Sequence, residues 1–524
     1  MAPELRRPSA AALPQGAAAA TTVLIGFMGA GKTTAARSLG AGAVDVDETI
    51  ETRLGRSVQE VFAEDGEAAF REIEERVTLE LLDDPAVHVV ALGGGAVTSL
   101  RVREALAACR VVWLDTEVDA AWSRVADGAD ERPLARDVRT FYDLHEARRP
   151  LYESLADVIV PASRSKRIAS VLDSLQGLPP VGVRVLWAAT SSADYPVYVG
   201  PGLLTGQRFW PAGIEGRRVL ITDYNAGRLY AETVEPLHGA VRIMPGEQSK
   251  TVAHAEIVWT ELVRHGATRA DVVVALGGGV VGDLAGFCAA TYQRGMRYVQ
   301  VPTTLAAQVD SAYGGKTGVN LSEAKNYVGA FHQPSAVIAD PLTLASLPSD
   351  ELAVGYAEVV KTGLIVGGEL WERLRAGAAP DDPDVIARCA LAKLRIVAQD
   401  ERDHGLRQLL NLGHTVAHAI ETATGYARYR HGEAVGLGLL AELRLSGAPE
   451  LRAEVKELLE ARGLPVRLEG AEVDPVIYAI AKDKKRVSDG PVPFVLCPAP
   501  GRPSIGCSVA PGDLRAAVKE LIAG

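Results

Sequence analysis

The chain has 524 residues, of which 48% are hydrophobic and 23% charged, a composition typical of a globular protein and not of a disordered or fibrous one. This length exceeds what one hydrophobic core usually supports, so we expect roughly two to four domains. The net charge of −11 argues against a nucleic-acid partner held by bulk charge. Any anionic substrate must therefore meet local clusters of basic residues.

Residues 1–20 are expected to form a disordered tail. Two arginines precede an alanine-rich run, but prolines and a glycine interrupt that run, and it holds almost no large aliphatic residues. We therefore do not interpret it as a signal peptide, and we expect no membrane partner. The five cysteines form no CxxC pair, which favours reduced thiols in the cytoplasm over a disulfide framework.

Residues 21–176 alternate short β-branched runs with charged amphipathic stretches, which predicts a parallel sheet flanked by helices. The first run leads directly into Gly26–Thr33, which fits the phosphate-binding pattern GxxxxGK[ST]. Backbone amides of such a loop wrap nucleotide phosphates, Lys32 would reach their oxygens, and the Thr33 hydroxyl would bind Mg²⁺. The expected nucleotide contacts are Gly29, Ala30, Gly31, Lys32, Thr33 and Thr34.

Further chemistry-bearing strings follow in this segment. Asp45 and Asp47 end a short predicted strand with both carboxylates on one side. The strings FRE (70–72), GGG (93–95), ERPL (131–134) and RRPLY (148–152) come next, and with them residues 21–176 resemble shikimate kinase. The resemblance implies that Asp45 joins the Mg²⁺ shell and that a lid at 125–137 brings Arg132 over the phosphates. It also implies shikimate contacts from Asp47, Arg71, Gly94 and Arg148, with Arg149 as the alternative to Arg148.

The segment departs from that family between the phosphate loop and Asp45. Only the stretch 33–44 separates Lys32 from Asp45, about four residues fewer than is usual there, and about four residues make one helical turn. We expect the first helix to lose one turn and keep its phase, which would leave the site intact. The alternative is that this part is a non-catalytic nucleotide-binding module.

Two near-identical strings, VVALGGGAV (89–97) and VVALGGGVV (273–281), have unrelated flanks. Each predicts a buried strand that ends in a glycine turn where the backbone approaches a ligand closely, and we do not interpret them as a duplication. GLPPVG at 177–182 predicts a linker, because its prolines and glycines stop any helix.

After the linker, residues 183–346 again alternate strands and helices, and residues 347–524 are predicted to be mostly helical. The whole chain is thus expected to be an α/β multidomain protein. Gly277, Gly279 and Gly282 fit a GxGxxG fingerprint, but no acidic residue clearly follows about twenty positions later. A nicotinamide cofactor is therefore expected to bind in a different mode from the usual one.

The helical part carries candidate metal ligands. His414 and His418 lie four residues apart on one predicted helix face, and Glu358 and His431 could complete a set. Two histidines and a carboxylate form a usual catalytic zinc site. Spacing alone favours His414 and His418 as the two histidines.

Strings from 245 onward resemble 3-dehydroquinate synthase, among them PGEQSK (245–250), GGGVVGDLAGF (277–287), LLNLGHTVAHAIE (409–421) and HGEAV (431–435). The resemblance implies a different metal set, in which Zn²⁺ or Co²⁺ binds Glu358, His414 and His431, while His418 lies near the substrate phosphate. It implies an NAD-binding half at 183–346 and a metal and substrate half at 347–524. The implied NAD contacts are Asp223, Glu247, Gln248, Lys250, Gly278, Gly279, Val280, Asp283, Thr303, Thr304, Lys316, Lys325, Thr343 and Ser346, where threonine is commoner at the last position. The implied catalytic and substrate-binding residues are Arg294, Asp310, Lys316, Asn326, Lys361, Lys393, Arg407, Asn411, His418 and Lys484 or Lys485.

Together the resemblances imply a bifunctional shikimate-pathway enzyme of aromatic amino acid biosynthesis, dimeric through its second part. One part would phosphorylate shikimate with ATP and Mg²⁺. The other would convert a seven-carbon heptulosonate phosphate into 3-dehydroquinate with NAD and a metal. There NAD⁺ would oxidise a carbinol, phosphate would leave, the hydride would return, and ring opening and aldol closure would follow. A related sugar-phosphate cyclase is the alternative for the second part.

Overall fold

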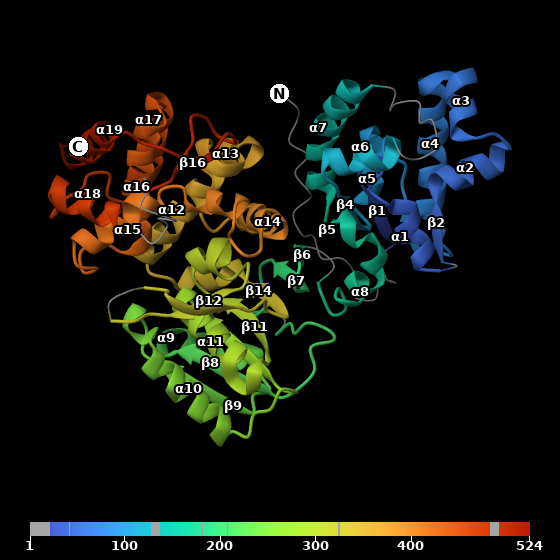
Figure 1. Ribbon diagram of the computed structural model, residues 1–524. Coiled ribbons are helices and arrows are strands. Elements are labelled where there is room, and N and C mark those ends of the chain that lie inside the picture. Colours follow the sequence, from blue (N-terminus) through green and yellow to red (C-terminus); the bar gives the residue numbers. More distant parts are fainter. Residues whose placement is uncertain are drawn as a thin grey trace. The chain divides into compact units, whose positions relative to one another are not determined.

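The computed structural model describes residues 21–40, 42–126, 137–179, 182–206, 208–322, 325–482 and 492–523. Contacts divide the chain into two compact units, Met1–Ala189 with Pro211–Gly213 and Thr190–Trp210 with Ile214–Gly524. The predicted tail at 1–20 lies outside the described residues, as do Arg132, Lys484, Lys485 and part of the predicted linker. The expectation of an α/β multidomain protein is confirmed (Figure 1).

The first unit is a parallel sheet with helices on its faces. Its strands run in the order β2-β3-β1-β4-β5-β6, and each neighbouring pair is parallel. The strands are β1 (Thr22–Ile25), β2 (Ala43–Asp45), β3 (Val89–Ala91), β4 (Arg110–Asp115), β5 (Val158–Pro161) and β6 (Arg184–Ala189). The helices are α1 (Lys32–Ser38), α2 (Val46–Leu54), α3 (Val58–Glu64), α4 (Gly66–Asp83), α5 (Leu100–Leu106), α6 (Val118–Ala126), α7 (Val138–Leu155) and α8 (Ile168–Asp173), with 3₁₀ turns η1 (Ala96–Thr98) and η2 (Ala162–Arg167).

Strand β6 lies beyond the predicted linker at 177–182, yet it pairs with β5. Val158 is opposite Val185, and Ile159 is opposite Leu186. The contacts therefore divide the chain after Ala189, not within 177–182. The amino-acid sequence of a strand does not specify which strand it pairs with, so this pairing could not be predicted.

The second unit begins with another parallel sheet, in the order β7-β14-β11-β10-β8-β9. Its strands are β7 (Asp194–Val199), β8 (Arg218–Asp223), β9 (Gly239–Ile243), β10 (Val272–Gly277), β11 (Arg297–Pro302) and β14 (Ala336–Ala339), and β12 (Lys316–Val319) forms an antiparallel hairpin with β13 (Val328–Phe331). The helices are α9 (Tyr224–Tyr230), α10 (Val252–Arg264) and α11 (Gly279–Thr291), with short turns η3 (Ala231–Val234), η4 (Glu247–Ser249), η5 (Tyr292–Arg294), η6 (Ala307–Ser311) and η7 (Pro341–Ser346). Strand β10 is buried throughout, as its unbroken apolar run predicts.

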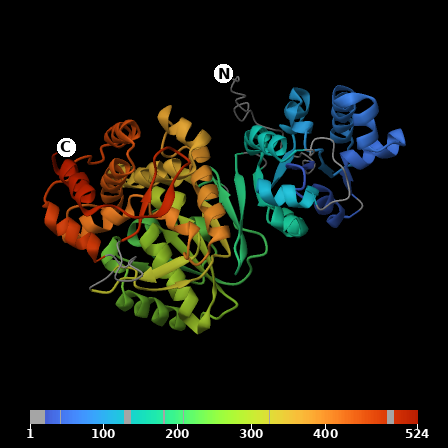
Figure 2. The same cartoon turned by 45° about the horizontal axis from the view of Figure 1, so that its top comes forward.

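The rest of the second unit is mostly helical, coloured orange to red in Figures 1 and 2. Its helices are α12 (Ser349–Val366), α13 (Gly368–Arg375), α14 (Pro383–Gln399), α15 (His414–Ala423), α16 (His431–Leu445), α17 (Pro449–Glu460), α18 (Val473–Ala481) and α19 (Pro511–Ala523), with the turn η8 (Leu406–Asn411). A small hairpin of β15 (Phe494–Leu496) and β16 (Ser504–Cys507) was not predicted. Among the described residues, no helix combines the length and apolar character needed to cross a membrane.

Candidate active sites

The phosphate-binding loop of the first unit joins β1 to α1. Gly29 and Gly31 have φ angles of 76° and 85°, which favour glycine, and a Cβ on Gly29 would lie 2.8 Å from the carbonyl oxygen of Ala121. Lys32 Nζ donates to the carbonyl oxygens of Gly26 at 2.8 Å and Phe27 at 3.1 Å. The ammonium group is thus folded back over the loop, where it can meet a phosphate held by the backbone amides.

A hydroxyl and a carboxylate meet beside this loop. Thr33 Oγ1 donates to Asp45 Oδ2 at 2.7 Å, and Asp45 Oδ1 accepts from the backbone N–H of Asp47 at 2.9 Å, which caps α2. Oxygen ligands of this kind suit Mg²⁺. Helix α1 covers only Lys32–Ser38, and the shortened segment still brings Thr33 against Asp45.

Charged side chains of α4 and α7 converge on the glycine turn after β3. Arg148 is buried and donates to the carbonyl oxygen of Gly94 at 3.1 Å, whereas Arg149 is only half-buried. A Cβ on Gly95 would lie 2.1 Å from Arg71 Nη1. A Cβ on Gly93 would lie 2.9 Å from Asp47 Oδ1. The expected substrate residues are therefore gathered around one turn.

Glu74 belongs to the same cluster and was missed in the sequence. It is buried and pairs with Arg71 at 2.5 Å. Burial raises the pKa of the Glu74 carboxyl, although Arg71, Arg148 and Lys32 act against this. Burial also lowers the pKa of Arg148, with the nearby Arg71 adding to the effect. The only sequence feature that pointed to Glu74 was its position three residues after Arg71 on a predicted helix.

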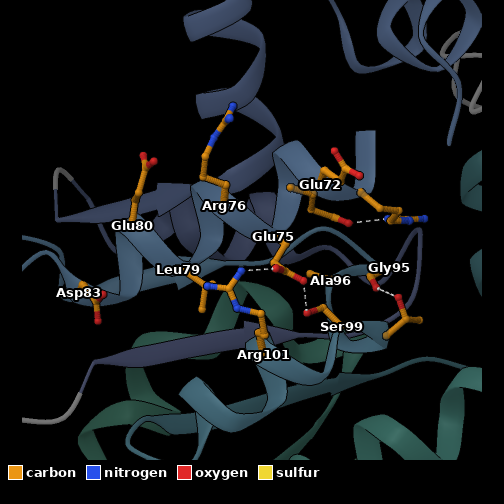
Figure 3. Close-up of a pocket in the computed structure, with 13 residues that line it drawn as sticks. Glu72, Glu75, Arg76, Leu79, Glu80, Asp83, Gly95, Ala96, Ser99 and Arg101 are labelled. Carbon is orange, nitrogen blue, oxygen red and sulfur yellow. Dashed lines mark hydrogen bonds and ion pairs between the residues drawn. The ribbon is translucent and has the colours of Figure 1, made fainter. Parts of the chain in front are cut away.

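A cavity of about 600 Å³ touches this cluster at one edge (Figure 3). It includes Arg71 and Gly95, but its other walls come mainly from the outer face of α4 and from residues 96–101. There the carboxylate of Glu75 accepts from Ser99 Oγ at 2.6 Å and Arg101 Nη1 at 2.8 Å. Because these charges satisfy one another, we take the turn cluster and not this cavity as the candidate site.

In the second unit, the carboxyl ends of the parallel strands β8, β10 and β11 lie at one edge of the sheet, where ligands of such folds bind. Asp223 ends β8 and caps α9. Gly277 ends β10 and accepts a hydrogen bond from the backbone N–H of Thr303, and a Cβ on Gly278 would lie 3.0 Å from Thr304 Cγ2. A narrow backbone turn with hydroxyls beside it can receive the phosphates of a dinucleotide, and Val280 follows in the first turn of α11.

Paired charges line the same edge. Lys250 Nζ lies 2.6 Å from Asp283 Oδ2 and 3.8 Å from Glu247 Oε1, and Asn320 Nδ2 donates to Glu247 at 2.7 Å. Burial raises the pKa of Asp283 despite Lys250. Burial would lower the pKa of Lys250, but the two carboxylates outweigh it and raise that pKa.

The remaining expected NAD contacts are already bonded within the chain. Gln248 Nε2 donates to the carbonyl oxygen of Pro245 at 2.9 Å. Thr343 is buried, and its Oγ1 donates to the carbonyl oxygen of Asp340 at 2.7 Å. Ser346 Oγ lies 2.7 Å from Tyr230 Oη.

A metal-binding group forms where three helices of the second unit meet. Glu358 of α12, His414 at the start of α15 and His431 at the start of α16 bring their ligand atoms within 4.8 Å of one another. Glu358 Oε1 is 3.7 Å from His414 Nε2 and 3.6 Å from His431 Nε2. The ring of His418 lies 5.7 Å from that of His414. The group therefore matches the set implied by the family resemblance, not the pair favoured by spacing.

Two lysines and the carboxylate of Asp310 lie next to this metal-binding group. Lys361 is 1% exposed and lies 2.6 Å from Glu358 Oε2 and 3.1 Å from Asp310 Oδ2. Lys393 pairs with the same Asp310 and donates to its carbonyl oxygen at 2.7 Å. Burial would raise the pKa of Asp310, but the two lysines hold it well below its ordinary value. Burial lowers the pKa of Lys393 and is only partly offset by Asp310.

Other expected substrate residues are more scattered. Arg407 is buried and donates to the carbonyl oxygens of Glu401 and Gly314, and Lys316 pairs with Asp403. Asn326 is exposed, and its backbone N–H donates to Asn320 Oδ1 at 2.9 Å. Asn411 is half-buried and ends η8, two residues before the loop residue Gly413.

Arg294 is not brought to this group. It is exposed and follows the carboxyl end of α11, whereas the nucleotide turn lies at the amino end of that helix. A helix of this length spans about 20 Å. Arg294 therefore lies at the opposite edge of the sheet, just before β11.

Comparison with known proteins gives a consistent result. Residues 28–178 match the family model "Shikimate kinase", residues 240–354 match "3-dehydroquinate synthase N-terminal", and residues 355–486 match "3-dehydroquinate synthase C-terminal". The chain is 45% identical to the 3-dehydroquinate synthase of Halorhodospira halophila over 305 residues, which cover 54% of this chain and 85% of that protein. It is 43% identical to that of Symbiobacterium thermophilum, with 62% and 98% covered.

A solved structure also matches the second unit. The 2-epi-5-epi-valiolone synthase of Streptomyces hygroscopicus, determined with NAD⁺ and Zn²⁺ bound, is 27% identical. The match covers 64% of this chain and 99% of that one, with a TM-score of 0.58.

Proposed function

The chain belongs to the 3-dehydroquinate synthase family and carries a shikimate kinase domain ahead of the synthase part, so it is a bifunctional shikimate-pathway enzyme with kinase and lyase activities. We propose two specific reactions for it. The first unit transfers the γ-phosphoryl group of ATP to the 3-hydroxyl of shikimate. The second unit converts 3-deoxy-D-arabino-heptulosonate 7-phosphate into 3-dehydroquinate and inorganic phosphate.

The convergence of Asp47, Arg71 and Arg148 on one glycine turn supports the kinase reaction most strongly. Guanidinium groups bind a carboxylate with paired hydrogen bonds, so the two arginines would hold the acid group of shikimate. Asp47 would orient the attacking hydroxyl and accept its proton. Lys32 would neutralise charge on the transferred phosphoryl group, and Thr33 and Asp45 would hold Mg²⁺.

The metal-binding group supports the synthase reaction most strongly. A buried carboxylate and two imidazole nitrogens within 4.8 Å of one another fit a catalytic zinc or cobalt site with an open position. A metal bound there would lower the pKa of a substrate hydroxyl. NAD⁺ held at the glycine turn would accept a hydride from the same carbon and later return it.

Charged side chains of the protein would surround the carbon that carries this hydroxyl. Lys361 lies between Glu358 and Asp310, so it compensates the charge of both carboxylates. Lys393 and Arg407 would bind anionic groups of the substrate, and His418, half-buried beside the metal-binding group, would contact the departing phosphate. Buried cations hold anions strongly, because water does not screen them.

The test is an assay of the purified full chain with both sets of substrates. We expect shikimate-dependent consumption of ATP and, separately, phosphate release from the heptulosonate phosphate. ATP consumption that does not respond to shikimate would favour a non-catalytic nucleotide-binding module. A faster reaction with another sugar phosphate would favour a related cyclase, because the valiolone synthase shares this fold.

Two wider proposals follow. We propose a homodimer through the second unit. The family resemblance implies that Arg294 binds substrate, but it lies at the opposite sheet edge from the nucleotide turn of its own chain, so it would reach a substrate in a second copy. Sedimentation of the full chain tests this, and a monomer would contradict it. We also propose a cytoplasmic location, which five free cysteines support. Fractionation of cells tests that location.

A further inference from the structure

Glu421 is a buried carboxylate that neither proposed reaction uses. It lies on α15 seven residues after His414, and residues with this spacing share one helix face. Its exposed fraction is 3%. A charge this deeply buried persists only beside opposite charges or hydrogen-bond donors, so its partners indicate its role.

Two positively charged or ionisable groups face the carboxylate. Glu421 Oε1 lies 3.6 Å from His431 Nδ1 and 3.2 Å from Lys325 Nζ. The other ring nitrogen of His431, Nε2, faces Glu358 in the metal-binding group at 3.6 Å. One ring nitrogen thus faces the carboxylate and the other faces the metal position.

With a metal bound at Nε2, this arrangement would leave the proton of His431 on Nδ1, where the Glu421 carboxylate lies 3.6 Å away. A neutral imidazole has one N–H and one free lone pair, and only the lone pair binds a metal. A carboxylate beside Nδ1 keeps the proton there and leaves Nε2 free. Such outer carboxylates fix the orientation of a metal-binding histidine and make it a better ligand.

Lys325 extends the contact toward the nucleotide side. Its ammonium also lies 4.4 Å from the ring centre of Tyr426, and it precedes Asn326 in the loop between β12 and β13. Lys325 is one of the residues that we expect to contact NAD. Glu421 therefore contacts a metal ligand on one side and a cofactor-binding lysine on the other.

We propose that Glu421 is a positioning residue that fixes the proton of His431 on Nδ1 and holds Lys325 in place for the nucleotide. The proposal rests on the proposed function, because it assumes that Glu358, His414 and His431 hold a metal. It adds a residue that acts through His431 and Lys325 and does not itself touch the substrate.

The test is titration of the metal-stripped full chain with Co²⁺, whose visible spectrum reports its ligands, and with Zn²⁺ in competition. We expect Glu421→Ala to weaken metal affinity by about 10- to 100-fold and to alter the Co²⁺ spectrum. Glu421→Gln should lose less, because its amide oxygen could accept the Nδ1 proton while carrying no charge. Both variants should also bind NAD more weakly. Lys325→Met should weaken NAD binding alone.

The matched control is Asp271→Asn. Asp271 is another buried carboxylate of this unit, paired with Arg217 at 2.8 Å before the amino end of β10. It should lose stability and keep its metal affinity. Equal losses of metal affinity in Asp271→Asn and Glu421→Ala would overturn the proposal, as would an unchanged Glu421→Ala.

If Glu421→Ala does not fold, Glu421→Gln decides, and wild-type affinity for both the metal and NAD in that variant overturns the proposal. Failure of the proposed function looks different. The wild-type chain would then bind metal no better than His414→Ala does, and the metal site itself would be wrong.

Discussion

Two glycine turns of this protein lie in nearly identical nine-residue sequences but have different surroundings. After β3, Gly93–Gly95 lead into the short turn η1, and Cβ atoms on Gly93 and Gly95 would each lie 2.1 Å from a charged atom, of Glu74 and Arg71 respectively. After β10, α11 begins at Gly279, where a Cβ on Gly278 would lie 3.0 Å from Thr304 Cγ2 and one on Gly277 would lie 3.1 Å from Asp223 Oδ2.

The difference shows what a short glycine string determines. In both places it ends a buried strand and leaves room for something beside the backbone. In the first turn charged side chains fill that room and form a candidate substrate site. In the second a longer helix, α11, begins, and the amino end of a helix suits phosphates. The residues that flank the glycines therefore determine which side chains and which helix surround each turn.

The largest effect expected is on the second site alone. His414→Ala should remove the bound metal and lower phosphate release by about 10³-fold or more, since a Lewis acid contributes several kcal/mol. The kinase activity should stay near wild type. Elemental analysis and both assays measure this.

His418→Ala is the matched control, because it should keep the metal and lose only rate. A metal-free His418→Ala protein would contradict the metal set and restore the pairing of His414 with His418 that spacing favours.

The converse change is Lys32→Ala. It should lower ATP-dependent phosphorylation of shikimate by about 10²- to 10³-fold, because a charge that stabilises the transition state is lost. Phosphate release by the synthase should be unaffected. Steady-state assays of both reactions on one preparation measure this, and loss of both activities would argue against separate sites.

Each of the two turns is expected to lie in a unit that folds without the other. Fragment 1–189 should be more stable than fragment 1–178 by roughly 3 kcal/mol, because the longer one keeps the buried Val185 and Leu186 of β6. Urea unfolding measures the difference, and each soluble fragment should retain kinase activity. Equal stabilities would place the functional boundary at the linker 177–182, as the sequence suggests.

The smallest expected effect comes from adding one methyl group to a glycine in each turn. Gly95→Ala should push the Arg71 guanidinium away and raise the KM for shikimate about tenfold, a cost near 1.4 kcal/mol. Gly278→Ala needs Thr304 to shift by only a few tenths of an ångström, so the KM for NAD should change less. Steady-state kinetics measure both constants, and a larger effect at Gly278 would reverse our interpretation of the two turns.

Local patterns predicted much of this structure. The phosphate loop is contiguous, so Lys32 and Thr33 were identifiable from spacing and from the strand before them. Alternation of apolar runs predicted both parallel sheets, and the later part was predicted to be mostly helical because strand patterns become rare after residue 347. The metal set was different, because helical spacing indicated His418, and only the family resemblance indicated His431.

What the sequence could not indicate depends on pairing across long separations. Strand β6 joins the first unit because it pairs with β5, which its own letters do not encode. Glu74 and Glu421 have roles only through the side chains that fold against them. Arg294 lies within a family string, yet the helix before it carries it to the far edge of the sheet.

The most direct test of two separate sites on one chain uses a strong zinc chelator in excess Mg²⁺. Phosphate release from the heptulosonate phosphate should fall to background and return when Zn²⁺ is added, because we propose that Glu358, His414 and His431 hold the metal. Shikimate phosphorylation should be unchanged throughout, because its Mg²⁺ would be held mainly by the nucleotide phosphates. Loss of both activities, or of neither, would contradict the account.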